Sequence, residues 1–213
     1  MAELSFVPRI QSSRQLQNLF WILLLLNIVF IFWSKNYLQP LETKDIVRFE
    51  VAKKVPIAES ILREWESERK LEKARQAIYV DYLFIVLYVA GLSIGSIYLS
   101  RLTGHPILKR AGRFIPFLLL GAGVCDVIEN MAMTYSLSGH LNGWNVWLAY
   151  DMAVTKFSIV ILALIFLGVC LIFFLTRIFA NKGREFSRIT GISFVFLLPW
   201  CSSALTIAHS QLC

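Results

Sequence analysis

Residues 157–176 read FSIVILALIFLGVCLIFFLT, a stretch without any charged side chain that Arg177 closes. About 20 apolar residues in a helix are enough to cross the ~30 Å hydrocarbon core of a bilayer. Similar apolar runs recur along the chain, and each is bounded by charged or turn-forming residues. We therefore expect five transmembrane helices. They cover about residues 17–35, 78–100, 114–135, 147–176 and 189–209.

The composition supports a membrane protein over a soluble one. Hydrophobic residues make up 57% of the chain and charged residues 16%, whereas soluble domains are nearer half apolar and a quarter charged. The net charge is +7, but the basic residues flank the apolar runs, and no nucleic-acid-binding motif accompanies them. We expect an all-α, polytopic membrane helix bundle forming a single membrane domain over residues 1–213, with no nucleic-acid partner.

The cysteines and histidines predict neither a metal site nor a redox site. The four cysteines are not spaced as CxxC, and the three histidines are scattered without a paired ligand spacing. Cysteines inside apolar runs usually act as small buried hydrophobic residues. We expect no metal and no cofactor.

The distribution of basic residues predicts the orientation. Loops 101–113 and 177–188 are rich in Lys and Arg, while loop 136–146 has neither. Short basic loops stay in the cytoplasm. We expect the N-terminus in the cytoplasm, the C-terminus outside and a multi-pass protein of the cell membrane. The first apolar run follows a charged start as in a signal peptide, but no small-residue cleavage site follows, so we interpret it as an uncleaved span.

Residues 37–76 form the one long polar segment between spans, and we expect them outside the membrane. Residues 46–51 partly alternate, which favours a short strand. Pro56 is suited to open a helix, and Glu59 and Arg63 have the favourable i,i+4 order of a helical ion pair. We interpret the segment as a helical arm on the membrane surface, with a partner-binding helix as the alternative.

Ionisable residues inside the spans are the candidates for function, because a membrane tolerates few of them. Asp126, Glu129 and Asn130 follow the spacing i, i+3, i+4 and share one helix face. Asp126 lies past the midplane and is too short to reach the interface, so it needs a partner or a proton. Apart from Lys35 at the end of the first span, Lys156 is the one cation we place in the spans, and it is the expected partner of Asp126.

Asp81, Tyr88 and Asp151 complete the predicted site. With the N-terminus inside, the charged residues of the spans all fall in the outer half of the bilayer. The pattern predicts a polar pocket that opens to the outside between spans two to five, the fifth contributing Ser202, Ser203, Thr206 and His209. Two alternatives stay open: Asp81, Asp151 and Lys156 as ordinary interfacial charges, and Asp126 with Glu129 as part of a structural ion pair.

Several of these residues also belong to a longer pattern. It runs Phe49-Glu50-Val51-Ala52, Ile61-Leu62-x-x-Trp65, Asp81-Tyr82-Leu83-Phe84-Ile85-x-x-Tyr88, Asp126-x-x-Glu129-Asn130 and Lys156. The pattern, over roughly residues 45–160, resembles a group of uncharacterised bacterial integral membrane proteins with no established activity. The resemblance implies a bacterial inner membrane and one unit formed by these residues, and it implies no mechanism.

The functional interpretation is therefore coarse. We expect the polar pocket to bind or transport a small molecule, an ion or a proton, with Asp126, Glu129, Asn130, Lys156, Asp81, Tyr88 and Asp151 as the binding residues. The alternatives are a structural or regulatory membrane subunit and an intramembrane enzyme acting on a lipid, so enzymatic activity stays undecided. The expected partners are the lipid bilayer and either further copies of the chain or another membrane protein.

Overall fold

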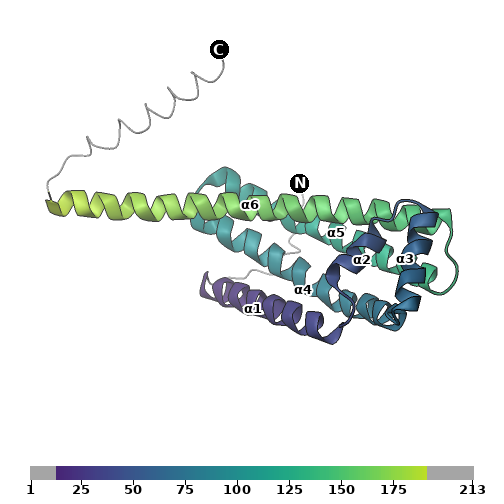
Figure 1. Cartoon of the computed structure of the whole chain (residues 1–213). Helices are drawn as coiled ribbons and strands as arrows, with labels where there is room; N and C mark the ends of the chain where they lie inside the picture. Colours follow the sequence, from purple (N-terminus) through teal and green to yellow (C-terminus); the bar gives the residue numbers. More distant parts are fainter. Residues whose placement is uncertain (1–12, 191–213) are drawn as a thin grey trace, which may run out of the picture. The chain divides into compact units, whose positions relative to one another are not determined.

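The computed structural model describes residues 13–190, with side chains over residues 14–179. These residues form helices and turns and contain no strand (Figure 1). In chain order the helices are α1 (Ser13–Tyr37), α2 (Thr43–Glu50), α3 (Val55–Ser67), α4 (Leu71–Thr103), α5 (Pro106–Leu137) and α6 (Gly143–Thr190).

Four helices are long and apolar enough to cross a membrane, over Arg14–Tyr37, Leu71–Thr103, Pro106–Leu137 and Gly143–Phe179. The all-α helix bundle expected from the sequence is thus confirmed, and it is compatible with an integral membrane protein. The helices extend beyond the predicted spans: the 33 residues of α4 measure about 50 Å, against ~30 Å for the hydrocarbon core. All but the first two residues of the predicted fifth span, 189–209, lie outside the described residues.

The chain divides into two compact units, Met1–Leu171 and Ile172–Cys213. The first holds α1 to α5 and the beginning of α6, and in the second the described residues continue α6 to Thr190. The loop expected over residues 177–188 is therefore wrong, because these residues are helical. They contain no proline, and their Lys and Arg residues are good helix formers, which outweigh the single helix-weakening Gly183. A single domain over residues 1–213 stays a prediction.

The first unit is organised around α4, which packs on α5 and α1. The turn from α4 to α5 contains Gly104 with φ 74°, a left-handed conformation that favours glycine. The amide of Asn27 in α1 donates to the backbone oxygen of Leu87 in α4 at 3.0 Å. A Cβ on Gly91 would lie 2.8 Å from the same amide nitrogen. Glycine at position 91 therefore lets α1 hydrogen-bond directly to the α4 backbone.

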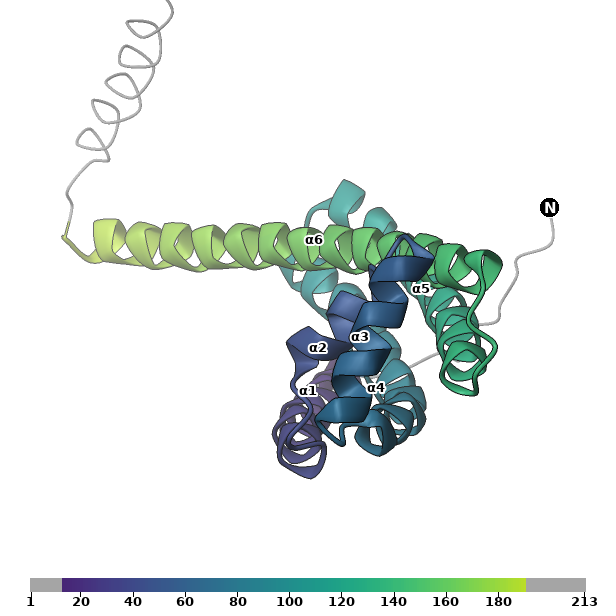
Figure 2. The same ribbon diagram turned by 45° about the vertical axis from the view of Figure 1, so that its right-hand side comes forward.

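Residues 38–70, which include α2 and α3, form a cap at the end of the unit where α4 begins and α5 ends (Figures 1 and 2). Trp65 is 0% exposed, and its ring lies 5.2 Å from that of Phe49. The two belong to an apolar core that reaches α4 at Ala77, α5 at Met133 and α6 at Ala149. The segment expected to lie on the membrane surface thus buries its apolar face against the helix ends.

In the cap, one prediction from the sequence is wrong and another is confirmed. The strand expected at residues 46–51 is wrong: α2 is a helix whose residues Asp45 and Phe49 face inward at i,i+4 spacing. The Asp45 carboxylate accepts a hydrogen bond from the Glu42 backbone N–H at 3.1 Å, which stabilises the helix start. The predicted opening of a helix at Pro56 is confirmed, since proline occupies the first turn of α3.

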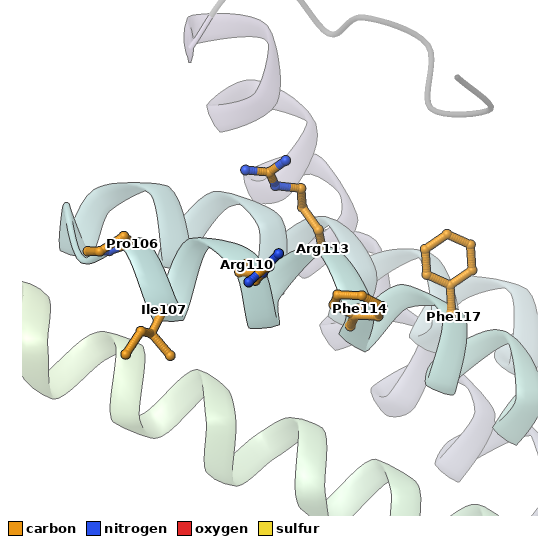
Figure 3. Close-up of a pocket in the computed structure, with 6 residues that line it drawn as sticks. All are labelled: Pro106, Ile107, Arg110, Arg113, Phe114 and Phe117. Carbon is orange, nitrogen blue, oxygen red and sulfur yellow. The ribbon is translucent and has the colours of Figure 1, made fainter. Parts of the chain in front are cut away.

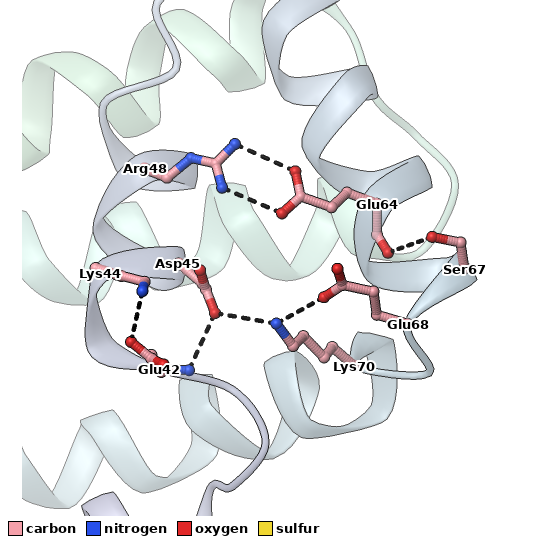
Figure 4. Close-up of polar contacts among 8 residues, drawn as sticks. All are labelled: Glu42, Lys44, Asp45, Arg48, Glu64, Ser67, Glu68 and Lys70. Atoms are coloured by element: carbon pink, nitrogen blue, oxygen red, sulfur yellow. Dashed lines mark hydrogen bonds and ion pairs between the residues drawn. The ribbon is translucent and has the colours of Figure 1, made fainter.

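Ion pairs hold α2 to α3 on the outside of the cap (Figure 4). The Arg48 guanidinium contacts both oxygens of Glu64 at 3.2 Å. Lys70 Nζ lies 2.6 Å from Glu68 and 3.5 Å from Asp45. Burial raises the pKa of Asp45, but the Glu42 N–H and the Lys70 ammonium outweigh it, so the net pKa is lowered. Asp45 is therefore an ionised anchor between the start of α2 and Lys70.

Candidate functional site

Helix α5 carries the predicted polar face and turns it into the bundle. Asp126, Glu129 and Asn130 are all buried, and Glu129 is 0% exposed. The Asn130 amide donates to Asp81 Oδ2 of α4 at 2.7 Å. The Tyr88 hydroxyl, about two helical turns after Asp81 in α4, donates to Asp126 Oδ2 at 2.9 Å. The helical spacing in α5 thus does place all three side chains against the neighbouring helices.

Lys156 of α6 is the centre of the site. Its Nζ donates to Asp126 Oδ1 at 2.6 Å, which confirms the partner expected from the sequence. The same Nζ lies 2.9 Å from Glu129 Oε2 and 3.8 Å from Glu50 Oε1. The Lys156 side chain is buried within the protein, and its depth in the membrane stays a prediction. One ammonium therefore joins residues from three helices: α2, α5 and α6.

Glu50 is the residue that sequence reasoning did not include in the site. It is the last residue of α2 in the cap, and it is 8% exposed. Burial raises the pKa of its carboxyl group, and the Lys156 ammonium opposes that effect. Residues outside a span are not expected to contact residues within one. The place of Glu50 in the Phe49-Glu50-Val51-Ala52 pattern was therefore the one feature of the sequence that could have indicated its role. Packing of Phe49 into the cap core directs Glu50 toward Lys156.

The charges of this site do not balance. We call Glu50, Asp81, Asp126, Glu129 and Lys156 the acidic cluster: four carboxyl groups and one ammonium. Two of its oxygens, Glu129 Oε1 and Glu50 Oε2, are buried and have no hydrogen-bond donor among the described residues. Glu129 Oε2 meets Lys156 at ion-pair distance but also without hydrogen-bond geometry. A buried polar atom without a partner is destabilising, commonly by about 1–3 kcal/mol, and a buried unpaired charge by more.

Asp151 is the predicted residue that the structure does not bring into the cluster. It is half-buried, and no hydrogen bond or ion pair joins it to the other predicted site residues among those described. In the described part of the chain, no group of three or more His, Cys, Asp or Glu side chains is arranged to hold a metal ion. Serines, threonine and histidine of the predicted fifth span lie outside the described residues.

The side chains of the acidic cluster pack directly against one another in this structure. Asp126, Glu129, Asn130 and Lys156 contact one another or neighbouring helices directly and are buried. A surface groove occurs instead at the opposite end of α5, from Pro106 to Phe117. A pocket that opens to the outside at the cluster stays a prediction.

Comparison of the chain with protein-family models, with curated proteins and with solved structures finds no match. The site is therefore interpreted from its own geometry.

Proposed function

We propose that this integral membrane protein binds and releases a proton at the acidic cluster, and that it couples this exchange to the binding or transport of a small molecule or ion. The observation that supports the proposal is the imbalance of three buried carboxyl groups, those of Glu50, Asp126 and Glu129, around one ammonium. Among the described residues, Glu129 Oε1 and Glu50 Oε2 have no hydrogen-bond donor. Full ionisation would leave several net negative charges in a low-dielectric interior, which is strongly unfavourable.

A bound proton resolves both difficulties at once. It removes one negative charge, and it converts an acceptor-only carboxylate into a group that can donate a hydrogen bond to a neighbouring carboxylate. Glu50 and Glu129 both lie within 4 Å of Lys156 Nζ, so their carboxyl groups are neighbours around the same ammonium. Carboxyl groups arranged in this way titrate as a coupled set rather than as independent sites.

The cap gives the proton a route from one side of the membrane. Glu50 belongs to the polar cap, while Asp126 lies inside a span, and Lys156 contacts both. With the N-terminus in the cytoplasm of a bacterial cell, the cap and the cluster are at the outer side of the membrane. A proton would then enter at Glu50 and pass to Glu129 or Asp126 through groups that already share Lys156.

Infrared spectroscopy of the full chain in lipid bilayers tests proton binding directly. The C=O stretch of a protonated carboxyl group is distinct from the bands of a carboxylate. We expect such a band near neutral pH in the wild type, and we expect Glu129→Gln or Glu50→Gln to reduce it. Asp151→Asn is the matched control on α6 and should leave the band unchanged. Complete ionisation of the wild type across the neutral range would rule out the proposal.

Coupling to transport needs a separate measurement. Proteoliposomes with a trapped pH indicator should report proton movement for the wild type and for Asp151→Asn, and none for Asp126→Asn. If the wild type moves no proton although the infrared band is present, the cluster binds protons without transporting them.

A structural role is the second candidate, and the short Lys156–Asp126 contact of 2.6 Å favours it. A purely structural cluster would hold α5 and α6 in register and have no exchangeable proton. The same infrared titration separates the two functions, because only the proton-binding cluster changes its bands with pH.

A further inference from the structure

A groove runs along the first turns of α5, at the end of the first unit opposite the cap (Figure 3). Arg110 and Arg113 line it nearer the start of the helix, and Phe114 and Phe117 line it further along the span. The remaining lining residues are Pro106 and Ile107. The groove therefore combines a cationic part with an apolar part along one helix.

The side chains of this groove are available to a ligand. Arg110 and Arg113 are exposed, and neither forms a hydrogen bond or ion pair with another described residue. The rings of Phe114 and Phe117 are each 64% exposed. Figure 3 shows the arginines and the two rings as successive side chains along α5. Two exposed guanidinium groups next to two exposed rings form an amphipathic surface.

The opposite face of α5 is fixed against α4, so the groove cannot be closed by a simple rotation of the helix. A Cβ on Gly112 would lie 2.2 Å from Ser100 Oγ and 2.7 Å from the Ser96 backbone oxygen. The two helix backbones therefore approach closely at Gly112, on the side away from the exposed rings. This contact holds Arg113 and Phe114 outward.

The position of the groove along the span decides its surroundings. Phe114 and Phe117 lie at the start of the span predicted over residues 114–135, and the arginines precede them in α5. From Arg113 to Phe117 the helix rises only about 6 Å. This is the scale on which the bilayer changes from headgroups to acyl chains, so the cationic part meets headgroups and the rings meet hydrocarbon.

We infer that the groove binds one anionic phospholipid, with the phosphate on Arg110 and Arg113 and an acyl chain across Phe114 and Phe117. Guanidinium groups are the preferred partners of phosphate oxygens because their N–H donors match the geometry. The rings distinguish this ligand from a soluble phosphate, which has no apolar part to contact them. Charge complementarity selects an anionic lipid over a zwitterionic one.

Native mass spectrometry of the full chain in detergent, with added lipid, tests the inference. We expect phosphatidylglycerol to bind at least about tenfold more tightly than phosphatidylcholine, and Arg110→Gln with Arg113→Gln to remove this preference. The matched control removes two positive charges from the same end, through Arg101→Gln with Lys109→Gln, and should keep the preference. Equal loss in both double variants would overturn the inference in favour of general surface charge.

The apolar part is tested with the same method. Phe114→Ala with Phe117→Ala should weaken binding of long-chain phosphatidylglycerol several-fold more than binding of a short-chain analogue. Inorganic phosphate is the second probe and should not displace the long-chain lipid. Displacement by phosphate alone, or equal weakening for both chain lengths, would show a free-anion site and contradict a lipid site. Size-exclusion profiles identify any variant that fails to fold, and Phe114→Leu with Phe117→Leu then replaces it.

Discussion

The cap and the acidic cluster lie next to each other, and both contain ion pairs, but these ion pairs are of different kinds. In the cap, Arg48 and Glu64 have side chains that are 51% and 36% exposed, and they supplement an apolar core around Trp65. In the cluster, Lys156 and Glu129 have side chains that are 8% and 0% exposed, and the carboxyl groups outnumber the ammonium. Burial and charge balance, rather than the number of ion pairs, therefore distinguish a candidate functional site from a set of exposed ion pairs.

The largest expected loss of stability comes from a substitution in the acidic cluster. Lys156→Met leaves several buried carboxyl groups without their cation, and removing one partner of a buried pair is typically destabilising by about 3–5 kcal/mol. We expect a large loss of stability in detergent unfolding, and a smaller loss when Asp126→Asn is added. A double variant that is less stable than Lys156→Met alone would contradict the view that unbalanced charge dominates.

The cap should respond most strongly to loss of its core. Trp65→Ala removes a fully buried side chain, a change that usually destabilises a protein by about 3–5 kcal/mol. We expect faster proteolysis within residues 38–70 and increased exchange of the Glu50 carboxyl proton, since the cap holds Glu50 at Lys156. Trp21→Ala, at a 56% exposed position of α1, is the control and should change neither readout.

The cap should also be sensitive to acid, through Asp45. Its pKa is lowered in the folded protein from an ordinary value of 3.8, so ionised Asp45 stabilises the fold above about pH 4. This contribution is lost as the pH falls through the lowered value. We expect Asp45→Asn to reduce stability at pH 7 and to make the cap less dependent on pH between 5 and 2, as measured by limited proteolysis. An unchanged acid profile would contradict the assigned role.

The smallest effect is expected at the outer ion pair of the cap. Glu64→Gln removes the negative charge that pairs with Arg48, but exposed ion pairs often contribute nothing measurable to stability. We expect unfolding midpoints close to the wild type at moderate salt. A loss as large as that of Lys156→Met would remove the contrast between the two regions.

Local sequence patterns predicted much of the described fold. Long apolar runs predicted the four described helices that are long and apolar enough to cross a membrane, and the helical period placed Asp126, Glu129 and Asn130 on one face. Lys156 was predicted as a partner because few cations lie within the spans. The sequence wrongly predicted a strand in place of α2, because residues 46–51 partly alternate in polarity. The helix forms instead because Asp45 stabilises its start and Phe49 packs inward.

The sequence by itself determined that this chain forms apolar helices with a few ionisable residues at defined positions along them, because hydropathy and helical period are local properties. Only the tertiary structure decided that Glu50 meets Lys156, that Asp151 stays outside the cluster and that the cap core rests on the ends of α4, α5 and α6. The physical reason is that such contacts depend on how distant helices pack. A side chain outside a span joins buried charges only where an apolar core, here around Trp65 and Phe49, brings its helix against the bundle.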